Sequence, residues 1–518
     1  MKDVTDLLYK KGDVIGGKFE VLGILGKGGF GIVYLVRHRE SGGVFALKTF
    51  RDELLGDSAA RQAFKKEASL WVNLERHPFV LAALWVQEVY ERLFVMMDYV
   101  EADPQGRVSL GDHIGRGQLD SNQLLKWAIE FCLGMEHARA QGIDCHRDIK
   151  PANILITQGG TLKISDFGLA SGVQMAWRES DGRSGSLVTC GNEGGFGFSL
   201  MQAAGKVRCG TPGYIAPEVY RCEGATTRSD IYSFGLVLWQ MAAGSRVPPF
   251  TVAWRGDVEG FLRKVYEHQM AGSMPRIEGW LGSVIECCLR PEPLQRYGSF
   301  QELRGDLEPI WKRKVGRKFV LPEVEQRTAA FWTNKGAALD ALGRHEEAIN
   351  CFDKALAIDP RDAYAWNNKG NTLAYLHRHE EAIRCFDKAL ANDPRFAFAW
   401  HNKGITLDAL GRYEEAVRCY DNVLVIDPQH PNAWSNKSAA LKELGRHQEA
   451  LDASDKALAI DPHNPNAWYG KALSEDELRH WREAASSYRK FIELAPPDYS
   501  QQIAHARQRI VQLKSDRR

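Results

Sequence analysis

The sequence predicts a multidomain protein in which an α+β unit is followed by an all-α superhelix. The chain has 518 residues, which is too long for one ordinary hydrophobic core. Residues 1–310 show no repeat and place glycine-rich turns between β-rich stretches. Beyond residue 329, tryptophans recur every 34 residues, and a fixed period of this length indicates stacked helical units.

Composition and charge exclude several classes of protein. Hydrophobic residues make up 44% and charged residues 26%, as expected for a folded soluble chain. The 67 basic and 66 acidic side chains give a net charge of +1, which argues against a nucleic-acid partner. Charged residues interrupt the most apolar stretch, 79–100, and the first residues lack the apolar run of a signal peptide. We therefore expect no membrane span and no secretion.

The cysteines indicate a reducing compartment. There are ten of them, with no tight framework and no C-x-x-C pair. This usage predicts a cytoplasmic protein without a zinc site.

The repeated segment has the features of paired helices. Leu-Gly-Arg occurs at 342–344, 410–412 and 444–446, where glycine supplies the left-handed conformation that ends a helix. A small alanine follows in every period and lets two helices approach closely. Asp-Pro closes the first four periods, because proline stops the second helix. The tryptophans are Trp332, Trp366, Trp400, Trp434 and Trp468, and the alanines are Ala348, Ala382, Ala416, Ala450 and Ala484.

This frame resembles the tetratricopeptide repeat, in five copies over 329–498. Residues 499–518 are predicted to form a capping helix that covers the last apolar face. The resemblance implies a superhelix whose groove binds a partner protein or peptide, and a module that only stabilises or spaces the chain is the alternative. We interpret the tryptophans as core residues and the recurring lysines as a solvated face rather than a basic ridge. These lysines are Lys335, Lys369, Lys403, Lys437 and Lys471.

The first chemical motif of residues 1–310 is rich in glycine. Gly26-Lys27-Gly28-Gly29-Phe30-Gly31 lies between the β-rich stretches 19–25 and 32–36. A dinucleotide-binding fold would open a helix at this point, so the flanks disfavour that class. A glycine-rich hairpin can instead lay backbone N–H groups over a triphosphate.

Lys48 lies in an apolar predicted strand, Phe45-Ala46-Leu47-Lys48. A lysine in such a strand needs an anionic partner or a ligand. Glu67, in the predicted helix 59–74, is a candidate partner.

The strongest signal is a set of polar motifs in a fixed order. His146-Arg147-Asp148-Ile149-Lys150-Pro151-Ala152-Asn153 is followed by Asp166-Phe167-Gly168 and by the segment 210–218, which contains Gly-Thr-Pro and Ala-Pro-Glu. Phosphoryl transfer needs one carboxylate to orient a hydroxyl nucleophile and further groups to hold magnesium. Asp148, Asn153 and Asp166 supply these groups in the expected order.

Together these motifs resemble the eukaryotic-type protein kinase catalytic domain, which is also found in bacteria, over 1–310 with a core at about 15–310. The resemblance implies a two-lobed α+β fold, ATP and Mg²⁺ as cofactors, and protein substrates. Asp148 would be the catalytic base, and Lys150 would contact the γ-phosphate. Lys48, positioned by Glu67, would hold the α- and β-phosphates. The Mg²⁺ ligands would be Asn153 and Asp166.

The same resemblance implies an ATP pocket. The glycine-rich loop would contribute Gly26, Gly28 and Gly31. The adenine would lie between Leu25, Val33, Ala46 and Leu155. Met97 would be the gatekeeper, with backbone hinge contacts from Asp98 and Val100. Glu218 is expected to pair with Arg296 and to hold the C-terminal lobe together.

Specificity and regulation are partly predicted. Lys150, two residues after Asp148, and Thr211, directly before Pro212, resemble the residues found at these places in Ser/Thr kinases rather than in tyrosine kinases. The segment from Asp166 to Glu218 is long for the family, and Val207 stands where many relatives carry an activating threonine. Phosphorylation within the insert would use Ser184, Ser186, Thr189 or Ser199, and activation without a phosphate is the alternative.

The chain is thus predicted to be a cytoplasmic Ser/Thr protein kinase in signal transduction. Residues 311–328 begin with a basic run that we interpret as a linker. The enzyme would transfer the γ-phosphoryl group of Mg·ATP to proteins, including itself. The array would recruit a substrate or a regulator and raise its concentration near the active site. The alternative is a pseudokinase scaffold whose repeats bind partners.

Overall fold

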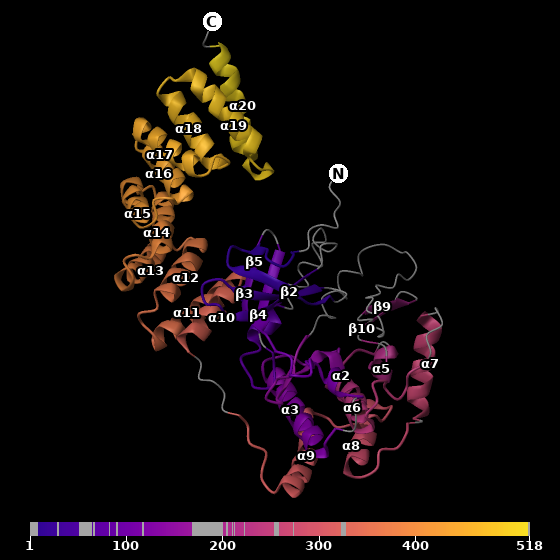
Figure 1. Cartoon of the computed structure of the whole chain (residues 1–518). Coiled ribbons are helices and arrows are strands. Elements are labelled where there is room, and N and C mark those ends of the chain that lie inside the picture. The colour runs from indigo at the N-terminus through magenta and orange to yellow at the C-terminus, as the bar shows by residue number, and fades with distance from the viewer. Residues whose placement is uncertain are drawn as a thin grey trace. The chain divides into compact units, whose positions relative to one another are not determined.

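The structure is a computed structural model that describes most of the chain. The described residues are 9–27, 31–50, 65, 68–81, 83–89, 92–115, 119–167, 200–203, 206–209, 211, 213–221, 223–252, 258–272, 274–322 and 328–515. The chain divides into two compact units, Met1–Gln326 and Arg327–Arg518 (Figure 1). Among the described helices, none combines the length and the apolar character needed to cross a membrane.

The first unit begins with a six-stranded antiparallel sheet. Its strands are β1 (Val14–Ile15), β2 (Phe19–Lys27), β3 (Gly31–His38), β4 (Val44–Phe50), β5 (Ala83–Val89) and β6 (Arg92–Asp98), in the order β1-β2-β3-β4-β6-β5. Alternating apolar residues turn one face of the sheet toward a core that contains Val21, Tyr34 and Leu47. Because β4 pairs with β3 and with β6, Lys48 is held between two neighbouring strands.

Most of the other described elements of the first unit are helices (Figure 1). The helices are α2 (Leu110–His113), α3 (Ser121–Ala140), α5 (Pro217–Tyr220), α6 (Thr227–Ala243), α7 (Val258–Ala271), α8 (Trp280–Cys288) and α9 (Phe300–Val315). The rings of Phe131 in α3 and Phe234 in α6 stack with their centroids 3.9 Å apart. Both rings are buried in the core of this unit. Helix α9 runs to Val315, so the first residues of the basic run are helical.

Two short hairpins flank the catalytic motifs. β7 (Ile154–Ile156) and β8 (Leu162–Ile164) follow the 3-10 turn Pro151–Asn153. β9 (Leu200–Ala203) and β10 (Lys206–Cys209) pair near the end of the long segment between Asp166 and Glu218. Val207 lies in β10. Residues 168–199, with Ser184, Ser186, Thr189 and Ser199, lie outside the described residues.

The second unit is a series of helix pairs, and one pair spans one period of 34 residues. The first helices are α10 (Ala329–Ala341), α12 (Ala363–Tyr375), α14 (Ala397–Ala409), α16 (Pro431–Glu443) and α18 (Pro465–Glu477). The second helices are α11 (His345–Ile358), α13 (His379–Asn392), α15 (Tyr413–Ile426), α17 (His447–Ile460) and α19 (Trp481–Leu494). Helix α20 (Ser500–Ser515) follows the last pair.

The turn within each pair uses a left-handed residue, as the sequence predicts. Gly343, Gly411 and Gly445 have φ values of 81°, 72° and 74°. His377 and Arg479 take the same conformation, at 59° and 61°, in the two periods that lack glycine. A side chain in this region costs about 1–2 kcal/mol, so the packing of the helix pair imposes the turn even where the local residue disfavours it.

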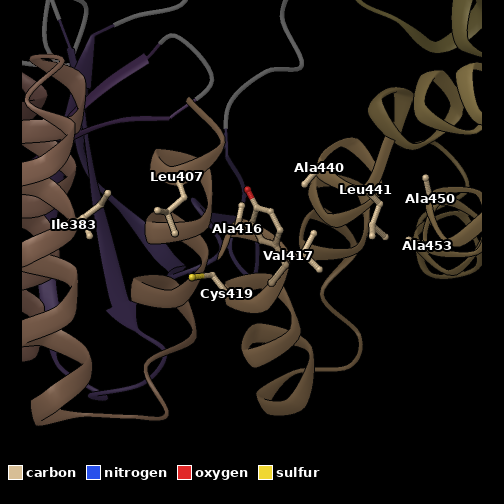
Figure 2. Close-up of a cluster of buried hydrophobic side chains, with 10 residues drawn as sticks. Ile383, Leu407, Ala416, Val417, Cys419, Ala440, Leu441, Ala450 and Ala453 are labelled. Atoms are coloured by element: carbon tan, nitrogen blue, oxygen red, sulfur yellow. The ribbon is translucent and has the colours of Figure 1, made fainter. Parts of the chain in front are cut away.

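A glycine facing an aromatic ring sets the close contact within the first three pairs. An added Cβ on Gly336, Gly370 or Gly404 would lie 2.6 Å from the ring that faces it, which belongs to Phe352, Phe386 or Tyr420. In the fourth pair both positions change, and the hydroxyls of Ser438 and Ser454 lie 2.7 Å apart. The recurring alanines are fully buried. Figure 2 shows one such cluster, in which Leu407, Val417 and Leu441 from successive helices pack together.

The recurring tryptophans and lysines stabilise the junctions between repeats. The indole N–H of Trp366 donates to the carbonyl of Pro360 at 3.0 Å, and Trp400, Trp434 and Trp468 repeat this bond. Lys369 forms an ion pair of 2.5 Å with Asp353 of the preceding repeat. Lys403, Lys437 and Lys471 form the same pair with Asp387, Asp421 and Asp455. Each of these four lysines is therefore paired with an aspartate, and together they do not form a basic ridge.

Helix α20 packs on the last helix pair. Ala506 and Leu513 share a buried cluster with Ala484 and Tyr488. The Arg509 guanidinium donates twice to the Asp476 carboxylate, at 2.7 and 2.8 Å. Paired donors of this kind fix orientation as well as position.

Candidate active site

The sheet positions Lys48. Strand β4 places it opposite Val33 of β3 and Val95 of β6, and its side chain is 5% exposed. The Lys48 ammonium lies 2.5 Å from the Asp166 carboxylate, between Nζ and Oδ1. The buried lysine thus has the anionic partner that its burial requires. Glu67 lies outside the described residues, so its contact with Lys48 stays a prediction.

Asp148 lies at the centre of a cluster of hydrogen bonds. Its Oδ2 accepts from the Asn153 amide at 3.0 Å and lies 2.8 Å from the Lys150 ammonium. Its Oδ1 accepts from the backbone N–H and the hydroxyl of Thr211, at 3.2 and 2.8 Å. Lys150 also donates to the Thr211 hydroxyl at 2.8 Å. The structure thus brings a polar side chain from the 210–218 segment against the catalytic motif.

Asp166 follows β8 and adopts a left-handed φ of 59°. Its side chain is 36% exposed, so a ligand can reach it. Burial alone would raise the pKa of Asp166, but the charge and hydrogen bond of Lys48, with Lys150 and His146, lower that pKa below its ordinary value. Asp166 is therefore an ionised carboxylate at neutral pH.

Asp230 of α6 holds the backbone of the catalytic loop. Its two carboxylate oxygens accept from the N–H groups of His146 and Arg147, at 2.6 and 2.9 Å. Arg147 has a φ of 71°, and these bonds fix that strained conformation. The His146 ring also bonds the Ser165 carbonyl at 2.9 Å, which joins the loop to the residue before Asp166. Burial raises the pKa of Asp230, and the neighbouring His146 partly offsets that rise.

Trp71 is a residue of the site that sequence reasoning missed. It lies in the helical residues 68–73 and is 3% exposed. Its indole N–H donates to the Phe167 carbonyl at 2.6 Å, and the Lys48 ammonium lies 4.6 Å from the centroid of its ring. One side chain therefore contacts both Lys48 and the segment after Asp166. The signal in the sequence is its position four residues after Glu67, a spacing that places both residues on one face of the predicted helix 59–74.

The residues predicted to surround adenine come from the six-stranded sheet and from the β7–β8 hairpin. Ala46 of β4 pairs with Met97 of β6, whereas Leu155 belongs to the β7–β8 hairpin. Ala46, Met97 and Val100 are buried, Val33, Asp98 and Leu155 are half-buried, and Leu25 is exposed.

The glycine-rich segment approaches a neighbouring strand closely. Gly26 pairs with Val33 across the β2–β3 ladder. A Cβ on Gly31 would lie 2.6 Å from the Thr49 carbonyl oxygen, so this position requires glycine. Gly28 lies outside the described residues.

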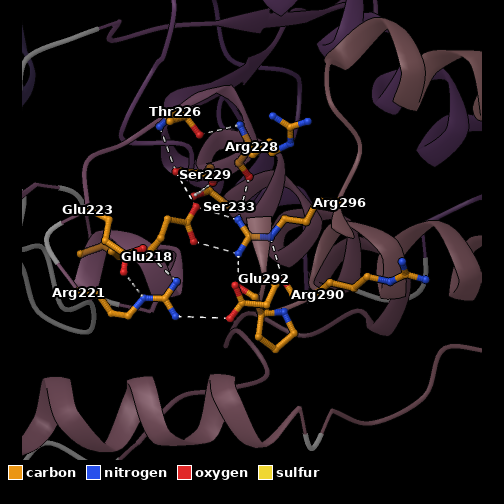
Figure 3. A network of polar contacts seen from close by, with 12 residues as sticks. Glu218, Arg221, Glu223, Thr226, Arg228, Ser229, Ser233, Arg290, Glu292 and Arg296 are labelled. Atoms are coloured by element: carbon orange, nitrogen blue, oxygen red, sulfur yellow. Dashed lines mark hydrogen bonds and ion pairs between the residues drawn. The ribbon is translucent and has the colours of Figure 1, made fainter. Parts of the chain in front are cut away.

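Glu218 and Arg296 form a buried ion pair (Figure 3). The Arg296 guanidinium donates to both Glu218 oxygens, at 2.8 and 2.9 Å. The Ser229 hydroxyl donates to Glu218 as well, at 2.6 Å. Burial alone would raise the pKa of Glu218, but the hydrogen bonds and charge of Arg296 lower that pKa below its ordinary value. The pair joins α5 to the turn before α9, as the resemblance implied.

The oxygen ligands of this cluster fit a magnesium ion. Asn153 uses its amide nitrogen on Asp148, which leaves its amide oxygen for another contact. Asp166 adds a partly exposed carboxylate. Oxygen donors of these two kinds are those that Mg²⁺ prefers. The residues present therefore fit the ion that the motif implies.

Comparisons with known families agree with this geometry. The family described as "Protein kinase domain" matches residues 19–306, and the tetratricopeptide repeat families match 329–362, 363–396, 397–430 and 431–464. Since the first match covers more than half of the chain, the chain belongs to the protein kinase family. The predicted fold class, a two-lobed α+β kinase fold followed by an all-α tetratricopeptide superhelix, is confirmed.

Similar proteins point to the serine/threonine type. A probable serine/threonine-protein kinase of Clostridium perfringens is 30% identical over 58% of this chain and 39% of its own length. A probable serine/threonine-protein kinase of Streptomyces coelicolor is 30% identical over 57% of this chain and 40% of its own length. This chain therefore matches about two fifths of the length of these relatives. The solved kinase domain of Mycobacterium tuberculosis PknI is 22% identical, covers 58% of this chain and 99% of that chain, and has a TM-score of 0.39.

Proposed function

We propose that this protein transfers the γ-phosphoryl group of Mg·ATP to serine and threonine hydroxyls of proteins, including its own. One observation carries the proposal. Asp148, Lys150, Asn153 and Thr211 share one set of hydrogen bonds beside the Lys48–Asp166 ion pair. Phosphoryl transfer is largely a matter of positioning and charge, and these groups supply both.

Asp148 would orient the attacking hydroxyl and accept its proton. Its carboxylate accepts a hydrogen bond from the Thr211 hydroxyl at 2.8 Å, so it can accept one from a substrate hydroxyl in the same way. Lys150, which lies 2.8 Å from that carboxylate, would bring a positive charge to the γ-phosphate.

Lys48 would bind the α- and β-phosphates, since its ammonium lies beside the Asp166 carboxylate. Asn153 and Asp166 would hold Mg²⁺, which neutralises phosphate charge when it is bound. Asp166 would then exchange part of its contact with Lys48 for the ion. Positioning of Lys48 by Glu67 is part of this proposal.

The nucleotide would bind between the sheet and the β7–β8 hairpin. Apolar contacts with adenine would come from Leu25, Val33, Ala46 and Leu155, with Met97 as gatekeeper. Backbone groups of Asp98 and Val100 would bond the adenine edge. The glycines Gly26, Gly28 and Gly31 would cover the phosphates, and the close approach at Gly31 supports this role.

Transfer of labelled γ-phosphate by the purified full chain tests the proposal. We expect incorporation into a serine-containing peptide and into the protein itself, and its loss in Asp148→Asn. The control is nucleotide binding by the variant, which should be unchanged within about twofold because Asp148 contacts the hydroxyl rather than adenine. Tight nucleotide binding without transfer by the wild type would overturn the proposal in favour of a pseudokinase scaffold.

We also propose that the repeats recruit a substrate or regulator to the kinase domain. The four repeats matched at 329–464 support this role, and the pair α18–α19, with helices of the same lengths, is proposed as the fifth. We propose a cytoplasmic location from the state of the cysteines. Those of the array, Cys351, Cys385 and Cys419, are buried free thiols, as expected in a reducing compartment.

A further inference from the structure

A basic segment lies at the end of helix α9. Residues 309–322 contain five basic side chains and no acidic one, whereas the whole chain has a net charge of +1. Even with Glu323, Glu325 and Arg327, residues 309–327 keep a net charge of +4. We call residues 311–321 the basic turn. Its five cations are all exposed, and they are Lys312, Arg313, Lys314, Arg317 and Lys318.

The chain reverses direction within the basic turn. Gly316 takes a left-handed φ of 78°, and its N–H donates to the Lys312 carbonyl at 3.0 Å. The Trp311 and Phe319 rings then meet with their centroids 5.4 Å apart. Eight residues of extended chain would instead span about 26 Å. Because Lys318 directly precedes Phe319, the cations that follow the helix lie beside those of its last turn.

Four of the five cations have no partner among the described residues. Lys314 is the exception, because its ammonium donates to the Ser121 hydroxyl at 2.9 Å and lies 5.5 Å from the centroid of the Trp280 ring. These contacts tie the turn to the starts of α3 and α8. The charged groups of the other four make no ion pair and no hydrogen bond within the part of the chain that the structure describes.

Acidic groups that precede the turn in α9 and at the start of α3 have other partners. Glu308 pairs with Arg304 at 2.6 Å. Asp306 accepts from the Tyr297 hydroxyl at 2.8 Å. The Asp120 carboxylate accepts from two backbone N–H groups of α3, at 3.1 and 3.2 Å. These carboxylates therefore leave the positive charge of the turn to an external anion.

The dipole of α9 explains only part of this cluster. Basic side chains in the last turn of a helix are favoured by its dipole, and three of the five lie there. Arg317 and Lys318 follow the C-cap residue Gly316, so the helix does not require them. A solvated connector gains nothing from exposed aliphatic side chains, yet Val320 is 77% and Leu321 51% exposed.

An anionic membrane surface fits both features of the turn. Anionic headgroups attract lysine and arginine side chains that lie close to the surface. The boundary between headgroups and acyl chains accepts aliphatic side chains. A nucleic acid would instead stack its bases on exposed aromatic rings, whereas Trp311 and Phe319 are half-buried and contact each other. The observations therefore favour a lipid surface over a nucleic acid.

We propose that the basic turn binds the surface of a membrane that contains anionic lipids. Its cations would lie at the headgroups, and Val320 and Leu321 would enter the boundary beneath them. The inference goes beyond the proposed function, because neither phosphoryl transfer nor recruitment by the repeats requires it. Binding would hold the kinase domain at the membrane and raise the local concentration of substrates there.

Sedimentation of the full chain with lipid vesicles tests this inference. One set of vesicles is phosphatidylcholine alone, and the other contains phosphatidylglycerol as about a third of its lipids. At low ionic strength, we expect binding to the anionic vesicles to be at least about tenfold tighter. That binding should fall as added salt screens the charges. Equal binding to both sets of vesicles, or binding to neither, would overturn the proposal.

A charge variant locates the contact. It replaces Lys312, Arg313, Arg317 and Lys318 by glutamine and keeps Lys314, which anchors the turn. We expect it to bind anionic vesicles at least about a hundredfold more weakly, because each lost cation lowers the affinity several-fold. Thermal unfolding followed by circular dichroism checks that the variant folds.

The control variant removes the same number of exposed cations from other places in the chain. It should bind anionic vesicles within about threefold of the wild type, because its cations lie outside the turn. Its substitutions are Lys264→Gln, Arg384→Gln, Arg395→Gln and Arg418→Gln. Equal weakening by both variants would show that net charge alone attracts the protein, and it would overturn the assignment of the site.

Two further comparisons separate a membrane from other anions. Val320→Ser together with Leu321→Ser should weaken vesicle binding by at least about threefold, because the change removes aliphatic contact and no charge. An unchanged affinity would refute insertion of these side chains, and with it the choice of a membrane. Duplex DNA, single-stranded RNA and glycerol phosphate serve as competitors at equal phosphate concentration. We expect each to bind more weakly than anionic vesicles, and stronger binding by any of them would overturn the proposal.

Discussion

Trp71 shows how one side chain can position several groups of the site. Its indole N–H bonds the Phe167 carbonyl, and its ring lies against the Lys48 ammonium. Neither contact touches a substrate directly. The residue therefore acts through Lys48 and Asp166, as a positioning residue.

Trp71→Phe is expected to lower kcat with little change in KM for ATP. The ring stays, but the buried Phe167 carbonyl loses its donor at a cost of about 1–3 kcal/mol, which would lower kcat about tenfold. Trp127→Phe is the control, because the indole of this buried residue donates to the Gly160 carbonyl at 3.0 Å. Steady-state kinetics should show no such fall for the control. An equal loss in both variants would mean that Trp71 only supports the fold.

Arg296→Met is expected to destabilise the kinase domain by about 3–5 kcal/mol, because it leaves Glu218 buried without its cation. Arg263→Met is the control, since Arg263 pairs with Glu267 at 3.9 Å on the surface and should contribute less than about 1 kcal/mol. The folded-state pKa of Glu218 lies below its ordinary value of 4.5. Its stabilisation is therefore present above pH 4.5 and is lost as the pH falls through the folded-state pKa. Urea unfolding at several pH values measures both effects.

At the scale of elements, the twelfth residue of the first helix in each repeat shows that the same position can contribute differently to the free energy of unfolding in different repeats. In α14 the Asp408 carboxylate accepts from the Tyr420 hydroxyl at 2.6 Å, and its other oxygen is buried without a partner among the described residues. In α18 the equivalent Asp476 is held by Arg509 of α20. The repeat sequence is similar in both places, so the neighbouring element makes the difference.

Asp408→Asn is expected to stabilise the array at pH 7 by about 1 kcal/mol. Burial raises the pKa of Asp408 from 3.8 to about 6, with the nearby Glu443 adding to the rise. Because the folded-state pKa is the higher one, ionisation costs stability above pH 6, and the cost disappears as the pH falls toward 3.8. Helical circular dichroism during urea unfolding should show the gain at pH 7 and a smaller one at pH 4.5. Asp476→Asn should instead destabilise, and a gain from both changes would contradict this account.

At the scale of the whole molecule, the chain joins a kinase domain to a repeat array, and each forms a compact unit. A recruiting array raises the local concentration of its ligand without changing the chemistry at Asp148. Binding and catalysis should therefore respond to different substitutions.

Deletion of 329–518 is expected to raise KM for a substrate that binds the array by about tenfold or more, while kcat stays the same. A short serine peptide that does not bind the array serves as the control, and its KM should not change. Steady-state kinetics on both substrates makes the comparison. Equal loss of activity on the two substrates would show that the array supports the kinase fold instead.

The sequence by itself determined the fold class, the 34-residue helix pair and the motifs that we propose for catalysis. These features are local, because glycine, proline and the polar motifs influence the backbone only within a few residues of their own positions in the chain. The left-handed turns at His377 and Arg479 already required packing to explain them.

Tertiary structure alone decided which partners these residues have. Lys48 and Asp166 are 118 residues apart, and Trp71 and Phe167 are 96 apart, so no local pattern pairs them. The recurring lysines appeared solvated in the sequence, whereas stacking of the repeats brings each of Lys369, Lys403, Lys437 and Lys471 against an aspartate 16 residues before it. The physical reason is that burial and charge pairing depend on which segments meet in space, and the folded chain alone determines that.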